Sequence, residues 1–268
     1  MKFTNSLKYI FLLMLIFVMS ACGNGETVEE REEDAHSGDA VEGTITVSAA
    51  ASLVDALEEV RAHFNEEYPE VQVDFNFGGS GALMQQIMQG APADLFFSAN
   101  ENHFKEVVDA GYIDEENKVD LLRNEIVLVV PEGSSAISSF DDLENADRIG
   151  IGNPESVPAG EYSIEAFENM NIMEEVESKL IFAEDVRQVL NYVETENVDA
   201  GVVYHTDALT SDGIGVVDTA PTDSHSPVIY PLGTLNETDN TEAQRAFYEY
   251  VQSEEAGEVF NEYGFIIE

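Results

Sequence analysis

The chain has 268 residues, of which 11 are Lys or Arg and 54 are Asp or Glu, so its formal net charge is −43 at pH 7. A field of this sign and size repels nucleic acids and anionic lipid headgroups, and we exclude both as partners. The field also repels small anions, so any anion site must overcome it locally. Screening in a high-salt habitat would shorten the field, to about 3 Å at 1 M ionic strength.

The first 21 residues have the pattern of a secretory signal peptide. Lys2 and Lys8 form a basic start, residues 10–18 are the unbroken apolar run IFLLMLIFV, and small residues precede Cys22. The apolar run is shorter than the about 20 residues that a membrane-spanning helix needs. Removal of residues 1–21 takes away Lys2 and Lys8, which changes the formal charge from −43 to −45.

Cys22 is the only cysteine of the chain, and an unpaired cysteine in an exported protein calls for an explanation. Residues 18–22, VMSAC, resemble a bacterial lipobox with Met19 in place of the usual Leu. This pattern predicts that Cys22 carries a lipid, and the alternative is an ordinary signal peptide with a chance cysteine. Residues 22–43 are acidic and hold few large apolar side chains, so we expect a flexible tether between the lipid and the folded part.

The rest of the chain alternates strand and helix patterns, which favours an α/β fold with parallel sheets. We expect strands at residues 44–48, 71–77, 94–97, 126–130, 148–151, 179–182, 200–204 and 228–232. We expect helices at residues 53–64, 83–88, 104–108, 158–170, 186–195 and 243–250.

About 225 residues suffice for two lobes of ordinary domain size. We assign residues 44–124 and 228–268 to the first lobe and residues 125–227 to the second. The chain would cross between the lobes near residues 123–128 and again near 217–230. Two crossings of this kind produce a hinged cleft.

Two serines stand where an expected strand turns into a helix. The hydroxyls of Ser52 and Ser80, with the first free N–H groups of each helix, can donate hydrogen bonds to an anion. Ser52 could instead only cap its helix, and the glycine-rich segment around Ser80 could be only a turn. Residues 78–82, GGSGA, are also one residue short of the G-x-S-x-G motif of serine hydrolases, for which His205 or His225 would follow in a suitable order.

Three further candidates lie at the same kind of boundary. Pro158 lacks an N–H group and leaves the N–H of Ala159 free at a helix start, and Val186 begins another helix. Tyr204 ends an apolar strand, and its phenol is a neutral donor suited to an oxyanion. No histidine shows metal-ligand spacing, and we expect His63 and His103 on exposed helix faces.

Taken in order, these segments resemble the molybdate-binding proteins of bacterial ABC transporters, over about residues 44–266. The similar stretches are ITVSAAASLVDAL, SGALMQQIMQGAPADLFFSA, GNPESVPAGEYSIEA, FAEDVRQVL, GVVYHTDA and FYEYVQSEEAGEVFNEYGF. Gly81 departs from the relatives, which often have Ser or Thr there. His205 replaces a residue that is small in relatives, and its role stays open.

The resemblance implies a two-lobed, type II periplasmic-binding-protein-like fold, each lobe a mostly parallel sheet flanked by helices, with the ligand in the hinged cleft. It implies that molybdate, and tungstate as well, is bound by Ser52, Ser80, Ala159, Val186 and Tyr204. The two serines would donate through hydroxyl and backbone, Ala159 and Val186 through backbone N–H, and Tyr204 through its phenol. The only metal at the site would be that of the oxyanion.

The resemblance further implies a monomeric, non-enzymatic protein without a cofactor. The signal-peptide and lipobox patterns predict that it is exported and lipid-anchored on the outer face of the cytoplasmic membrane. Its partner would be an ABC permease that recognises the ligand-closed form. The alternatives are a binding protein for another solute, such as sulfate, phosphate or iron, or a serine hydrolase that uses Ser80.

Overall fold

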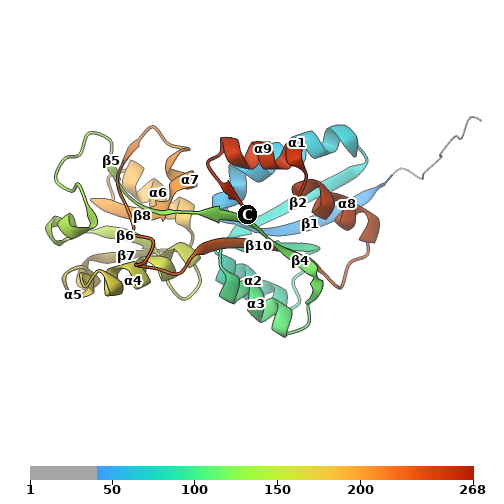
Figure 1. Ribbon diagram of the computed structural model, residues 1–268, viewed down its shortest axis with the longest axis horizontal. Coiled ribbons are helices and arrows are strands. Elements are labelled where there is room, and N and C mark those ends of the chain that lie inside the picture. The colour runs from blue at the N-terminus through green and yellow to red at the C-terminus, as the bar shows by residue number, and fades with distance from the viewer. Residues whose placement is uncertain (1–40) are drawn as a thin grey trace, which may run out of the picture. The chain divides into compact units, whose positions relative to one another are not determined.

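The computed structural model describes residues 41–268 (Figure 1). The predicted signal peptide, the predicted lipid site at Cys22 and most of the predicted tether lie outside the described residues. Gly43, expected to end the tether, already begins the first strand. Across residues 41–268, no helix is both long enough and apolar enough to cross a membrane.

The first sheet has six strands in the order β11-β4-β10-β3-β1-β2. Its strands are β1 Gly43–Ala50, β2 Val71–Gly78, β3 Leu95–Phe97, β4 Ile113–Asn124, β10 Val228–Leu235 and β11 Ile266–Ile267. The associated helices are η1 Ala51–Leu53, α1 Val54–Glu67, α2 Ser80–Met88, α3 Glu101–Asp109, α8 Thr241–Val251 and α9 Glu254–Glu262. We call this sheet with its helices lobe 1.

The second sheet has five strands in the order β7-β6-β8-β5-β9. Its strands are β5 Ile126–Pro131, β6 Ile149–Gly152, β7 Leu180–Ala183, β8 Ala200–Tyr204 and β9 Ile214–Thr219. The associated helices are η2 Phe140–Asn145, α4 Pro158–Asn169, α5 Met173–Val176, η3 Glu177–Lys179, α6 Val186–Glu194 and α7 His205–Ala208. We call this sheet with its helices lobe 2.

Helices cover both faces of the lobe 1 sheet, with α1, α8 and α9 on one face and α2 and α3 on the other (Figure 1). The short strand β3 is continuously apolar because both of its faces are buried. Leu95 and Phe97 point into the core that includes α1, α8 and α9, whereas Phe96 points into a second core built by α2 and α3. Side chains alternate along a strand, so a strand covered on both faces needs apolar residues at every position.

The chain passes twice between the lobes, as the two-lobed fold predicts. β4 ends at Asn124 and β5 begins at Ile126 in the other sheet, and β9 ends at Thr219 before β10 begins at Val228. β4 and β10 lie next to each other in the lobe 1 sheet. That the lobes move as separate bodies about these crossings stays a prediction.

The expectation of mostly parallel sheets needs a correction, because both sheets are mixed. In lobe 1, β1 pairs in parallel with β2 and β3, but β10 is antiparallel to β3 and β4. In lobe 2, β6 is parallel to β7 and β8, whereas β5 is antiparallel to β8 and β9. β10 and β5, which follow the two crossings, run opposite to the parallel strands of their sheets. Their pairings are therefore antiparallel.

Most expected elements are present, with ends that shift by a few residues. Strands β4, β9 and β11 and helices η2, α5, η3, α7 and α9 were not expected from the sequence. The sequence of β4, IDEENKVDLLRN, is largely polar. Few of its residues are buried, so the strand needs no apolar pattern. Its pairing with β10 and β11, rather than an apolar repeat, makes it a strand.

Glycine lets α4 approach the lobe 2 sheet at one point. A Cβ atom on Gly160 in α4 would lie 2.0 Å from the carbonyl oxygen and 2.5 Å from the carbonyl carbon of Gly152 in β6. Both are backbone atoms that no side-chain rotation can move. The start of α4, which carries Pro158 and Ala159, can therefore lie against the end of β6 only with glycine at position 160.

We predict that Gly160→Ala lowers the free energy of unfolding by about 3 kcal/mol, at the upper end for overpacking, because backbone must shift. Urea unfolding followed by circular dichroism measures the change. Gly257→Ala in α9 is the matched control, because nothing lies within 4 Å of its added Cβ. That control should gain up to about 1 kcal/mol from helix propensity. Equal effects of the two substitutions would contradict the packing argument.

Candidate functional site

The five predicted site residues all lie where a strand meets a helix. Ser52 lies in η1 directly after β1, and Ser80 is the first residue of α2. Ala159 and Val186 lie in the first turns of α4 and α6, and Tyr204 is the last residue of β8. All five are buried. Because the carboxyl ends of parallel strands gather at one edge of a sheet, these positions face the junction of the two lobes.

Four of the five residues line one small cavity between the lobes, with a volume of about 10 Å³. The fifth, Ala159, is not part of the lining, although its preceding neighbours are. No charged side chain of the described residues is part of this lining. The lining consists of Ala50, Ala51, Ser52, Gly78, Gly79, Ser80, Ala99, Val157, Pro158, Val186 and Tyr204.

The two serines do not serve as helix caps. Neither η1, α1 nor α2 has a side-chain hydrogen bond at its N-cap. The Ser52 Oγ lies 2.9 Å from the phenol oxygen of Tyr230, and the Ser80 Oγ accepts a hydrogen bond of 2.9 Å from the backbone N–H of Ala99. The capping interpretation of Ser52 is therefore wrong, and each hydroxyl bonds to a group outside its own helix.

Tyr204 carries a buried polar atom without a partner. Its phenol oxygen has no hydrogen bond within residues 41–268, although the side chain is fully buried and lines the cavity. Burial raises the pKa of Tyr204 well above its usual value, and the neighbouring phenol of Tyr230 acts in the same direction. The phenol therefore stays protonated and acts as a donor. A buried donor left unpaired by the fold is expected to have a partner that the protein itself does not supply.

Backbone donors add to this set. The N–H groups of Ser80, Ala159 and Val186 lie in first helical turns and donate to no acceptor within residues 41–268. The first N–H groups of a helix lack an intrahelical partner, and the helix dipole places partial positive charge there. The junction thus gathers neutral donors from three helix starts, two hydroxyls and one phenol. Such a set can bind an anion without a cationic side chain.

The two lobes are in direct contact around the cavity. The N–H of Gly81 in α2 donates to the carbonyl oxygen of Ser156 in lobe 2 at 2.9 Å. A Cβ on Gly79 would lie 2.7 Å from that same oxygen, so glycine is needed for the approach. Asn100 Nδ2 donates to Glu161 Oε2 at 3.0 Å across the same junction. The sequence indicated Gly81 as a departure from the relatives, and the structure gives its N–H an interlobe role.

One arginine forms an ion pair between the lobes. Arg187 of α6 forms an ion pair with Asp55 of α1. Its Nε also lies 2.7 Å from Oδ1 of the fully buried Asp207, at an orientation that makes an ion pair but not a hydrogen bond. Burial raises the pKa of Asp207 to about 7, although the guanidinium of Arg187 opposes the shift. Sequence patterns gave no sign of this cluster, because its members are far apart in the chain.

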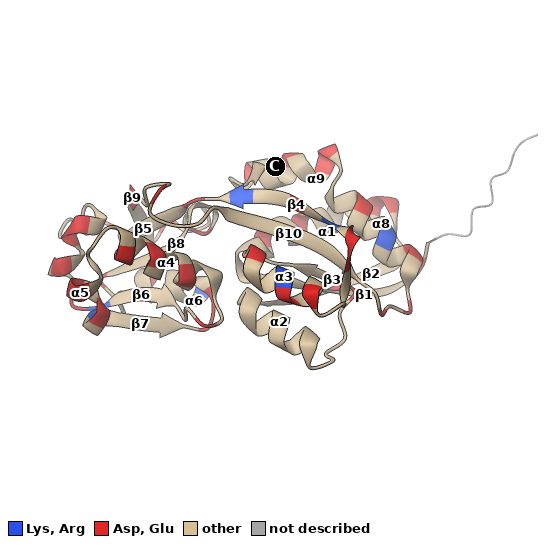
Figure 2. Cartoon of the chain, turned by 60° about the horizontal axis from the view of Figure 1, so that its bottom comes forward, with Lys and Arg blue, Asp and Glu red and all other residues tan. Residues whose placement is uncertain are grey.

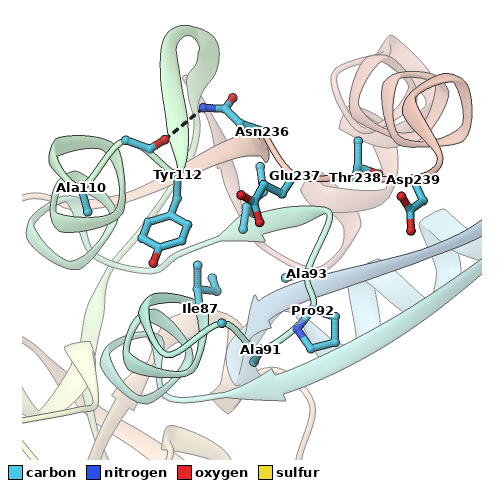
Figure 3. A pocket seen from close by; sticks show the side chains of 13 residues that line it. Ile87, Ala91, Pro92, Ala93, Ala110, Tyr112, Asn236, Glu237, Thr238 and Asp239 are labelled. Atoms are coloured by element: carbon cyan, nitrogen blue, oxygen red, sulfur yellow. Dashed lines mark hydrogen bonds between the residues drawn. The ribbon is translucent and has the colours of Figure 1, made fainter.

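A larger pocket lies elsewhere in lobe 1, away from the predicted residues (Figure 3). It has a volume of about 770 Å³ and is bordered by Ile87, Tyr112, Glu237 and Asp239. The side chain of Asn236 donates to the carbonyl oxygen of Gly111 at its edge. Two carboxylates on the rim repel an anion, so we do not assign the oxyanion to this pocket.

The histidines differ in part from expectation. His103 is buried in α3 rather than exposed, and its ring packs near Gly81. Burial lowers its pKa, with Glu161 acting in the opposite direction. His63 is half-buried. Within residues 41–268, no group of three or more His, Cys, Asp or Glu side chains could hold a metal ion.

Comparisons with known proteins agree with this geometry. The model of a family described as bacterial extracellular solute-binding protein matches residues 45–266. The chain belongs to this family. As extracellular solute-binding proteins, its members work outside the cytoplasm and are binding proteins, so the prediction that the chain is not an enzyme is confirmed. Consistent with this, Ser80 Oγ bonds to the N–H of Ala99 and to no histidine of the described residues.

Two curated relatives cover most of this solute-binding protein. YvgL of Bacillus subtilis, named as a substrate-binding lipoprotein of an ABC transporter, is 45% identical over 97% of this chain and 97% of its own. The molybdate-binding protein ModA of Escherichia coli is 40% identical over 84% of this chain and 90% of its own. The family resemblance predicted from the sequence is thereby confirmed.

Solved structures confirm the two-lobed fold. The substrate-binding domain from Clostridium difficile, titled as belonging to a molybdenum ABC transporter, has a TM-score of 0.65 and 36% identity, and the match covers 83% of this chain and 97% of that one. The periplasmic molybdate-binding protein of Azotobacter vinelandii has a TM-score of 0.76 at 17% identity, over 84% of this chain and 99% of that one. At that identity the second match supports the fold alone.

We predict that Asp207 makes the folded protein less stable as the pH rises. Its pKa is about 7 in the folded chain against 3.8 for an ordinary Asp side chain. Between these values the folded state keeps a proton that the unfolded state has released, so this group's contribution to the free energy of unfolding falls as pH increases. Urea unfolding across that range should show that the unsubstituted protein loses stability relative to Asp207→Asn.

The control for this prediction is Asp142→Asn. Hydrogen bonds from Ser138 hold the pKa of Asp142 below its usual value, so its contribution has the opposite sign and lies at lower pH. A stability difference between the unsubstituted protein and Asp207→Asn that stays constant from pH 3.8 to about 7 would refute the assignment.

Proposed function

We propose that this protein captures molybdate, and tungstate as well, for an ABC importer. The anion would sit in the cavity between the lobes, bound by Ser52, Ser80, Ala159, Val186 and Tyr204. The observation that carries the proposal is the buried phenol of Tyr204, which lines the cavity and lacks a partner within the described residues. The names of the relatives from Escherichia coli and Clostridium difficile support molybdate as the ligand.

The chemistry of the cavity supports a fully deprotonated oxyanion. Hydrogen bonds to a charged acceptor contribute about 1.5 to 3 kcal/mol each, so several neutral donors can hold a dianion. A ligand that carries its own O–H would direct it at another donor. Discrimination among tetrahedral anions then depends on the size of the cavity, and sulfate is smaller than molybdate or tungstate.

We further propose that residues 44–124 with 228–268 and residues 125–227 move as two bodies about the crossings. The interlobe hydrogen bond from Gly81 to Ser156 and the ion pair from Arg187 to Asp55 support a closed arrangement. The cavity of about 10 Å³ admits roughly one water-sized sphere, so the lobes must part to admit an anion. Small-angle scattering with and without molybdate would measure this motion.

The protein would act as a monomer beside the membrane. We propose that Cys22 carries a lipid that anchors the chain on the outer face of the cytoplasmic membrane, where the permease takes over the anion. The lipoprotein name of the relative from Bacillus subtilis, which matches 97% of this chain, supports the anchor. Two acyl chains are needed for stable anchoring, which a diacylglyceryl cysteine provides.

We predict that Tyr204→Phe raises the Kd for molybdate about 10- to 100-fold, because the anion loses one hydrogen bond to a buried donor. The same change should leave thermal stability unchanged or raise it, because the phenol oxygen has no partner among the described residues. Titration calorimetry with molybdate, tungstate and sulfate measures the affinities.

Tyr250→Phe is the matched control for this prediction. Its phenol oxygen is also buried without a partner in the described residues, but it lies outside the cavity, so its Kd should match that of the unsubstituted protein. Tight binding of sulfate without binding of molybdate or tungstate would refute the proposed ligand.

We predict that Cys22→Ser releases the protein from the membrane fraction into the soluble extracytoplasmic fraction, because the lipid has no attachment atom. Metabolic labelling with a radioactive fatty acid, followed by fractionation, measures this change. Calorimetry on the released protein should give the molybdate affinity of the parent. Equal fatty-acid labelling of the two forms would rule out Cys22 as the lipid site.

A further inference from the structure

We propose that Tyr230 and Asn124 are positioning residues that fix the direction in which the Ser52 hydroxyl donates its proton. Neither residue lines the cavity. The inference rests on the proposed function, since it concerns how the same anion site is built. It follows from four hydrogen bonds made by Asn124 and Tyr230, which leave only one arrangement of donors and acceptors.

The orientation of the Asn124 amide is set by its neighbours. The backbone N–H of Glu125 donates to Asn124 Oδ1 at 2.9 Å, so the oxygen must face that group. The Nδ2 atom then faces the other way and donates to Thr206 Oγ1 at 2.8 Å and to the phenol oxygen of Tyr230 at 3.2 Å. A side-chain amide nitrogen has two hydrogens and accepts none, so both are used.

This arrangement decides the role of the Tyr230 phenol. Its oxygen already accepts from Asn124, so its own hydrogen is available for the other neighbour, Ser52 Oγ at 2.9 Å. Tyr230 is fully buried, and burial raises its pKa well above the usual value, so the hydrogen stays in place. Its ring packs against those of Tyr204 and Phe265, at centroid distances of 5.8 and 5.5 Å, which holds the phenol in position.

The Ser52 hydroxyl therefore accepts from Tyr230 and keeps its own hydrogen for the cavity. Ser80 is set in the same way by a different donor, because its Oγ accepts from the N–H of Ala99. In both serines a protein donor occupies the acceptor side that could otherwise turn toward the ligand. The cavity then presents hydrogens at both positions, which disfavours an anion that carries an O–H group.

The hydrogen-bonded chain from Asn124 through Tyr230 to Ser52, which we call the relay, also links the site to the crossings between the lobes. Asn124 is the last residue of β4, and Tyr230 lies in β10, where it pairs with Leu122 of β4. Thr206, the third partner, belongs to α7 of lobe 2. The Ser52 donor is thus held by the two strands that carry the chain between the lobes.

The test is a double-mutant cycle with molybdate as the titrant. Tyr230→Phe keeps the ring and removes the donor to Ser52, so its Kd should rise roughly 10-fold. In a Ser52→Ala background the same change should alter Kd by less than about 2-fold, because there is no hydroxyl left to orient. Asn124→Ala tests the relay from its other end, and its effect should also shrink in that background.

A second readout separates orientation from simple loss of structure. In Tyr230→Phe the Ser52 hydroxyl is free to turn and accept, so binding of hydrogen arsenate, a tetrahedral anion that carries one O–H at mildly alkaline pH, should improve relative to molybdate. Tyr263→Phe is the matched control, because it also removes a bonded phenol, here from Glu59, outside the cavity. It should change neither affinity.

The outcomes distinguish the two levels of the proposal. If the unsubstituted protein binds neither molybdate nor tungstate, the proposed function fails. If it binds and Tyr230→Phe leaves Kd unchanged, or lowers affinity equally with and without the Ser52→Ala substitution, the positioning role alone is refuted.

Discussion

The site depends on one physical constraint: buried hydrogen-bond donors converge on a small cavity and outnumber the protein acceptors near them. None of the described residues that line this cavity has a cationic side chain. The phenol of Tyr204 shows this most directly, because an unpaired buried polar group costs about 1 to 3 kcal/mol. The local architecture follows from that constraint. Small residues at the strand ends admit backbone N–H groups, and the glycines of the α2 start let the lobes close over them. The fold thereby leaves the Tyr204 phenol and the first N–H groups of the helices without a protein acceptor among the described residues.

The acidic surface and the proposed anion site can coexist because they act over different distances. The Asp and Glu residues are spread over the outer helices of both lobes (Figure 2), whereas the cavity is lined by uncharged residues. Interactions between exposed charges fade over about 8 Å at physiological ionic strength, whereas interactions of buried groups are screened much less. Arg187 adds a local positive charge near the junction, where it forms ion pairs with Asp55 of one lobe and Asp207 of the other.

Much of the fold and the positions of the candidate residues could be predicted from local patterns. The strands before Ser52, Ser80 and Val186 are short alternating or apolar segments followed by helix starts, and such signals need only a few neighbouring residues. The polar strand β4 could not be found in this way, because its strand state comes from pairing with β10, which lies far along the chain. The partners of the two serines were hidden for the same reason.

The long-range contacts also change how the lobes and the site are related. A hinge could in principle leave the ligand donors unaffected, with the lobes acting only as walls. Here Asn124 stands at the end of one crossing strand and bonds both to Tyr230 of the other and to Thr206 of lobe 2. A rotation of lobe 2 that moves Thr206 away would break its hydrogen bond to the Asn124 amide. The orientations of the Tyr230 phenol and the Ser52 hydroxyl, which depend on that amide, would then be less fixed. In the proposed open form Ser52 would then be a less ordered donor, so the proposed closure would favour the ordering of the proposed anion site.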